Sequence, residues 1–77
     1  MTDYFSRIVS ITSDYLGPAS ERFVRRQIDF HLEKLPENLT SADVKKLAES
    51  VRVALGLLTQ EKTAVDDAYR RITNLAA

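Results

Sequence analysis

The sequence contains no cysteine among its 77 residues. This absence excludes disulfides, thiolate nucleophiles, iron–sulfur clusters and zinc sites built on cysteine. A chain without cysteine is also typical of a cytoplasmic protein. Only two glycines and two prolines are present, alongside 44% hydrophobic and 29% charged residues. That composition excludes disordered and collagen-like chains and favours helices.

The chain also lacks an excess of charge of either sign and a long hydrophobic run. Eleven lysines and arginines balance eleven aspartates and glutamates, so no net field attracts nucleic acid, an anionic membrane or an acidic substrate over distance. Ser, Thr, Asp and Arg interrupt the apolar residues of positions 1–17, which argues against a signal peptide and a membrane span. We therefore expect a soluble, cytoplasmic protein.

The length fits one domain, residues 1–77, because two cores of half this size would bury too little surface to offset chain entropy. No internal repeat is present, and no stretch alternates apolar and polar residues long enough for a strand. The sequence predicts an all-α, bundle-like domain with four helices at about residues 3–16, 18–34, 41–55 and 60–75. A domain this small buries only about 60% of its unfolded surface, so we expect association to stabilise it.

Two glycines mark helix boundaries. Gly17 is suited to cap the first helix, and Pro18 is tolerated at the start of the second. We expect Gly56 to end the third helix and Thr59 to cap the fourth, with a helix that continues past Gly56 as the alternative.

The start of the third helix carries the strongest local signal. Pro36 disfavours helix at the residue before it, and Thr40 follows as an N-cap with Asp43 three residues on. Leu39 and Val44 occupy the two positions of a hydrophobic staple. This pattern predicts a helix that begins immediately after Thr40.

Apolar residues recur at helical spacing and define a core side for each helix. These core-side residues are Tyr4, Phe5, Ile8, Val9, Ile11, Tyr15 and Leu16; Val24, Ile28, Leu32 and Leu35; Val44, Leu47, Ala48, Val51, Ala54, Leu55 and Leu58; and Ala64, Val65, Ala68, Tyr69, Ile72 and Leu75. Phe23, Phe30 and Val53 lie outside the stripes. Either the second helix is central, with neighbours on two sides, or Phe23 and Phe30 form a seam for a partner protomer. Such surplus apolar surface is typical of an interface.

Three small residues run beside the core side of the first helix: Ser6, Ser10 and Ser13. They form either a solvated face or a seam that another helix approaches closely, and we include them with Phe23, Phe30 and Val53 as candidate interface residues. On the fourth helix, Asp66/Arg70 and Asp67/Arg71 are spaced as acid-first pairs on a solvated face.

The sequence predicts no catalytic, cofactor-binding or metal site. His31, the only histidine, shares no helical face with Asp29 or Glu33, and we expect it at the edge of the core. No Gly-x-Ser-x-Gly elbow or glycine-rich phosphate loop is present. We therefore expect a protein that is not an enzyme, with no small-molecule substrate.

A basic cluster on the second helix permits an alternative. Its members are Arg22, Arg25 and Arg26, and a helix-turn-helix around Gly56 would add Gln60 and Lys62 as DNA contacts. Acidic residues in the same turns of the fourth helix oppose phosphate contact, and Asp29 is spaced to pair with Arg25 or Arg26. A solvated face is therefore favoured, followed by a docking patch for an acidic protein, with DNA last.

Residues 14–19 (DYLGPA) and 23–26 (FVRR) resemble the Tyr-Ile/Leu-Gly-Pro-Ile/Ala and Val-Arg-Arg pattern of small helical domains appended to bacterial serine/threonine kinases and other signalling proteins. The resemblance covers about the first third of the chain. It implies a bacterial, non-catalytic regulatory or interaction module. Together with the surplus apolar residues, it leads us to expect a protein–protein interaction module that forms a homo-oligomer, with a small DNA-binding regulator as the alternative.

Overall fold

The computed structural model describes residues 3–32 and 34–76. These residues form four α-helices and two short 3-10 turns, with no strand among them. In chain order the elements are α1 (Tyr4–Leu16), the turn Gly17–Ala19, α2 (Ser20–His31), the turn Pro36–Asn38, α3 (Ser41–Leu58) and α4 (Lys62–Leu75). The prediction of an all-α domain is confirmed.

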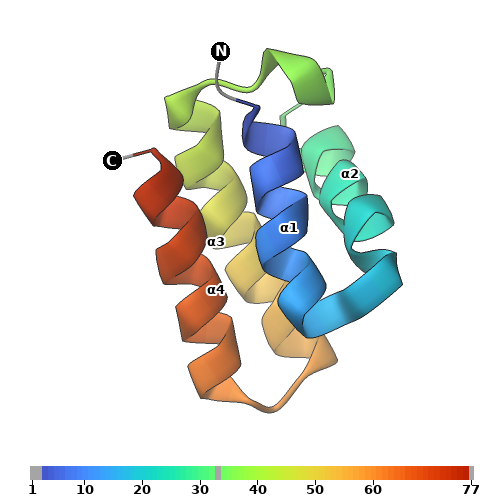
Figure 1. Ribbon diagram of the computed structural model, residues 1–77, viewed down its shortest axis with the longest axis vertical. Helices are drawn as coiled ribbons and strands as arrows, with labels where there is room; N and C mark the ends of the chain where they lie inside the picture. Colours follow the sequence, from blue (N-terminus) through green and yellow to red (C-terminus); the bar gives the residue numbers. More distant parts are fainter. Residues whose placement is uncertain (1–2, 33, 77) are drawn as a thin grey trace.

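The helices run alternately up and down (Figure 1). α1 packs between α2 and α4, and α3 contacts the same two helices from the other side. This arrangement follows from the short connections, because a helix that ends in a tight turn can return only alongside its predecessor. The described residues therefore form an antiparallel bundle.

The predicted caps at the start of α3 are confirmed. The Thr40 side chain accepts a hydrogen bond from the backbone N–H of Asp43, and the Asp43 carboxylate accepts one of 2.9 Å from the backbone N–H of Thr40. Leu39 and Val44 are both buried, as a hydrophobic staple requires. The sequence reading missed Lys34, whose Nζ lies 2.7 Å from the same carboxylate.

Four helix ends differ from the prediction by two residues or more. α2 begins at Ser20 and not at residue 18, because Gly17–Ala19 form a 3-10 turn. The last residue of α2 is His31, so Lys34 lies outside the helix, and Leu35 has extended backbone and is exposed instead of joining the core. α3 continues through Gly56 to Leu58, because among the glycines only Gly17 adopts a positive φ, of 62°.

The connection between α3 and α4 is also displaced from its predicted position. Thr59 is extended at the end of α3, and its hydroxyl accepts a hydrogen bond from the N–H of Glu61. α4 begins at Lys62 and not at residue 60, and its N-cap position is Glu61, so the prediction that Thr59 caps this helix is wrong. Leu58, predicted on the core side, is 63% exposed because α3 ends there, beyond the reach of the other helices.

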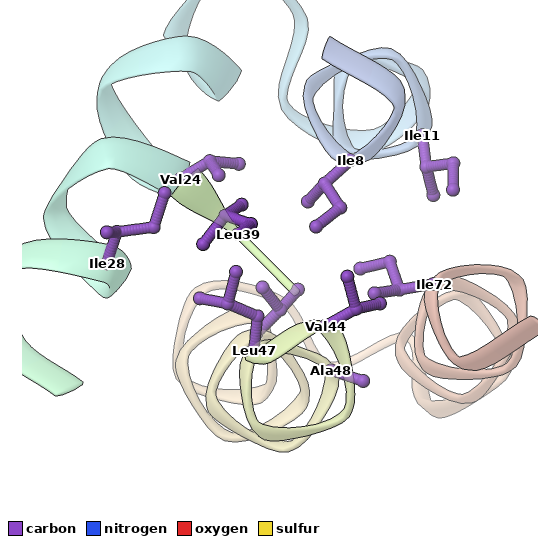
Figure 2. Packing of buried hydrophobic residues seen from close by; sticks show 10 residues of the cluster. Ile8, Ile11, Val24, Ile28, Leu39, Val44, Leu47, Ala48 and Ile72 are labelled. Carbon is purple, nitrogen blue, oxygen red and sulfur yellow. The ribbon is translucent and has the colours of Figure 1, made fainter. Parts of the chain in front are cut away.

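The core draws on all four helices and on the loop before α3. Its main cluster comprises Ile8, Ile11, Val24, Ile28, Leu39, Val44, Leu47, Ala48, Val51 and Ile72 (Figure 2). A second cluster of Leu55, Val65 and Ala68 packs against Tyr15 and Leu16. Thr12 is the unexpected member of the buried face, and it is tolerated because its hydroxyl donates to backbone carbonyls one turn earlier.

Candidate interaction surface

Large apolar side chains remain on the surface of the described chain in two places. One is the end of α2 with the loop that follows it, and the other is the C-terminal half of α3. The exposed residues are Phe30, Leu35, Val53, Leu57 and Leu58. Because a buried core drawn from all four helices is already present, these side chains are surplus to the folding of one chain.

The structure separates the two phenylalanines that the sequence grouped together. Phe23 is half-buried and packs against the core, whereas Phe30 is 74% exposed. Neither sequence alternative holds for both residues, since α2 has a neighbour over Phe23 and none over Phe30. Phe23 therefore contributes to the fold, and Phe30 is the stronger candidate of the two for contact with another molecule.

Val53 lies on the face of α3 that points away from the core. It follows the fully buried Val44 by nine positions, and at about 100° per residue this spacing places it on the opposite side of the helix. Val53 is 63% exposed, and Leu57, one turn further on, is 84% exposed. We call these two side chains the α3 ridge.

A groove between α2 and α3 runs beside the α3 ridge. We call it the α2–α3 groove, and its lining comprises Gln27, His31, Lys46, Glu49, Ser50, Val53, Ala54 and Leu57. The Ser50 hydroxyl donates a hydrogen bond of 2.5 Å to Oε1 of Gln27, which ties the two helices together. Lys46 and Glu49 carry opposite charges, so the lining has no net charge with His31 neutral.

A second hollow lies on the other flank of the α3 ridge, between α3 and α4. It is lined by Arg52, Val53, Gly56, Thr59, Gln60, Lys62, Val65 and Asp66. Val53 contributes to both hollows, so it stands between them as a raised apolar side chain. The sequence placed Leu57 beside Val53 only for the alternative in which the third helix continues past Gly56, and α3 does continue to Leu58.

His31 is exposed on a wall of the α2–α3 groove, and its predicted place at the core edge is wrong. α2 ends at this residue. Leu32, which follows it, still packs against the core, whereas Leu35 is exposed. Within residues 3–32 and 34–76 no cluster of three or more His, Cys, Asp or Glu side chains is placed to hold a metal ion.

The three serines of α1 are exposed. The Ser6 hydroxyl donates to the Asp3 carboxylate at 2.7 Å, and the Ser13 hydroxyl donates to the carbonyl of Ser10 at 2.7 Å. Two of the hydroxyls are therefore satisfied within α1. The serine side chains are small and polar, so this stripe is a weaker candidate contact than the α3 ridge.

The arginines of α2 line an open hollow together with Phe30. Its lining comprises Pro18, Ala19, Glu21, Arg22, Arg25, Arg26, Asp29 and Phe30. Arg25 lies 3.7 Å from Glu21 and stacks over the Phe5 ring, 5.1 Å from its centroid. The predicted ion pair of Asp29 with Arg25 or Arg26 does not form. Arg25 pairs instead with Glu21, one turn earlier on α2.

A polar cluster that the sequence did not indicate joins α1 to α4. The Tyr15 hydroxyl donates to the Asp67 carboxylate, and Arg71 donates to the Tyr15 oxygen at 3.3 Å and pairs with Asp14 at 2.9 Å. The predicted solvated pair of Asp67 with Arg71 is wrong, because both side chains turn toward α1. Burial, together with the Asp67 carboxylate, raises the pKa of Tyr15.

Comparisons of this chain with protein-family models, with curated proteins and with solved structures return no significant match. Of the helices that the structure describes, none has the length and apolar character needed to cross a membrane. The evidence for function is therefore the surface chemistry of the described residues.

Proposed function

We propose that this chain is a non-catalytic protein-association module of a bacterial cytoplasmic regulatory or signalling system, and that its first partner is a second copy of itself. The observation that carries the proposal is the α3 ridge, where Val53 and Leu57 are 63% and 84% exposed beside a groove in which the charges of Lys46 and Glu49 cancel. Apolar side chains grouped in this way mark contact surfaces more often than isolated ones.

Energetics support a partner on this face. An apolar side chain gains about 1.5–3 kcal/mol when it moves from water to a packed site, and neither ridge residue obtains that gain within one chain. A domain of 77 residues has a small core, so binding to its folded form adds appreciably to its stability. The regulatory setting rests on the resemblance of residues 14–19 and 23–26 to signalling modules.

The mass of the protein in solution tests this proposal. Sedimentation equilibrium over a wide concentration range distinguishes a monomer of 8.7 kDa from a dimer of twice that mass. We expect the weight-average mass to rise with concentration and reach a plateau at a closed oligomer. A monomer at every concentration would contradict self-association.

The alternative of a helix-turn-helix DNA-binding regulator finds less support. α3 and α4 lie side by side and antiparallel (Figure 1), whereas the helices of that motif cross at about 90–120°. Arg22, Arg25 and Arg26 lie on α2, while Gln60 and Lys62 lie at the α3–α4 connection and line a different hollow. The candidate DNA contacts therefore do not form one surface.

A further inference from the structure

We propose that the α3 ridge and the α2–α3 groove form a twofold interface, in which α3 packs antiparallel against α3 of a second copy. This inference rests on the proposed function and specifies its surface, its partner and its register. A twofold contact requires one patch that is complementary to itself, and three properties of this face meet that requirement.

The first property is the register of the residues on α3. A twofold axis that crosses α3 between Val51 and Arg52 makes the two α3 helices antiparallel. Residues at equal distances on either side of that point then face each other across the interface. The α3 residues that line the groove then pair among themselves, with Lys46 opposite Leu57, Glu49 opposite Ala54, and Ser50 opposite Val53. Every groove-lining residue of α3 therefore faces another from the partner copy.

The second property is shape. Val53 and Leu57 are four residues apart and form a ridge of the kind that packs into grooves between helices. In the proposed register Val53 lies against Ser50 of the partner, whose hydroxyl already donates to Gln27 within its own chain. Leu57 reaches the end of the partner's groove near Lys46 and His31. Each ridge thus enters the groove of the other copy.

The third property is charge. Each copy brings one Lys46 and one Glu49 to the face, so the contact carries no net charge and no net repulsion. The aliphatic stem of Lys46 can cover the partner's Leu57 while its ammonium stays in water. Glu49 pairs at 3.1 Å with Arg52 of its own chain and faces the small side chain of Ala54. No charge in this register is buried without a partner.

The first experiment compares two double variants by sedimentation equilibrium. We expect Val53→Asp with Leu57→Asp to retain full helical circular dichroism and to weaken dimerisation at least about 100-fold, since two apolar anchors are lost. The matched control, Phe30→Asp with Leu35→Asp, alters two residues of similar exposure elsewhere and should dimerise like the wild type.

Cross-linking tests the register. Because the chain has no cysteine, a single introduced cysteine can form only intermolecular disulfides. In the proposed register Lys46→Cys faces Leu57→Cys of the partner, whereas two copies of one variant place their cysteines about 16 Å apart along the helix axis. We expect an equimolar mixture to form disulfide dimers on oxidation, and either variant alone to form few.

The outcomes separate this inference from the proposed function. A wild-type oligomer that persists in the variant with Val53→Asp and Leu57→Asp, or that cross-links through Leu57→Cys alone, would overturn the twofold interface and leave self-association standing. A wild type that stays monomeric would overturn both.

Discussion

At the scale of single residues, the start of α3 depends on Asp43. Its carboxylate is nearly buried and accepts hydrogen bonds from the Lys34 ammonium and the backbone N–H of Thr40. These bonds, the one from Lys34 first, hold the pKa of Asp43 below its ordinary value. A lowered pKa means that the ionised form stabilises the fold above the unfolded pKa, about 3.9, and that this contribution is lost as pH falls through the folded pKa.

We expect Asp43→Asn to lower the free energy of unfolding at pH 7 by about 1–2 kcal/mol, because an amide cannot replace the charged acceptor. The difference from wild type should begin to shrink below about pH 5, where the unfolded chain takes up the proton first, and should vanish only as pH falls through the lowered folded pKa of Asp43. Urea unfolding across this pH range measures it, and Asp29→Asn, at an exposed site on α2, is the control. A difference that is independent of pH would contradict the role of the charge.

The contacts of Asp43 also show which side-chain contacts can be predicted from the sequence. The bond to Thr40 was predictable because a cap joins residues three apart, and its geometry follows from the start of the helix. The bond from Lys34 was not, because it depends on how the loop after α2 returns to α3. The different burial of Phe23 and Phe30 has the same origin. Helical spacing predicts which residues share a face of the helix, but it does not predict which element packs against that face.

At the scale of elements, the two glycines have opposite roles. Gly17 has φ of 62° and ψ of −136°, a region that strains any residue with a Cβ by about 1–3 kcal/mol. Gly56 lies inside α3 without a positive φ, and a Cβ built there would meet no atom within 4 Å beyond the adjacent residues and the local helix backbone. We expect Gly56→Ala to stabilise the protein by about 0.5–1 kcal/mol and Gly17→Ala to destabilise it. Thermal unfolding measures both changes, and a loss of stability in Gly56→Ala would contradict a continuous α3.

The presence of four helices was predictable because the signals for a helix are local. The helix ends near Gly56 were not predictable from such signals. A glycine both caps helices and occurs inside them, and the choice depends on φ, which tertiary contacts select. Leu55, immediately before the glycine, packs with Val65 and Ala68 of α4, and α3 continues past it to Leu58. This extension places Leu57 on the same face as Val53, so the candidate interface itself depends on an element boundary that local signals do not determine.

At the scale of the whole molecule, the arrangement of four helices was predictable only as a bundle, because the spatial order of helices depends on pairs that are distant in sequence. The bond between Gln27 and Ser50 and the cluster around Tyr15 are two such pairs. Neither residue type nor spacing marks them, since each side chain alone is an ordinary polar group on an amphipathic helix. Both become visible only when α2 lies beside α3 and α1 beside α4.

The link between α1 and α4 gives a prediction for the molecule as a whole. The Tyr15 hydroxyl is bonded to Asp67 and Arg71, and its raised pKa means that the neutral phenol stabilises the fold. That contribution is complete below the unfolded pKa, about 10, and is lost as pH rises through the folded pKa. We expect Tyr15→Phe to lower the free energy of unfolding at pH 7 by about 0.5–1.5 kcal/mol.

The same substitution should also reduce the loss of wild-type stability above pH 10, because the titrating phenol is gone. Urea unfolding at pH 7 and at pH 9 to 11 measures both effects. Asp14→Asn serves as the control, since it removes only the exposed end of the cluster, which is worth at most about 1 kcal/mol. An unchanged alkaline slope in Tyr15→Phe would show that α1 and α4 are held together by apolar packing alone, without help from this cluster.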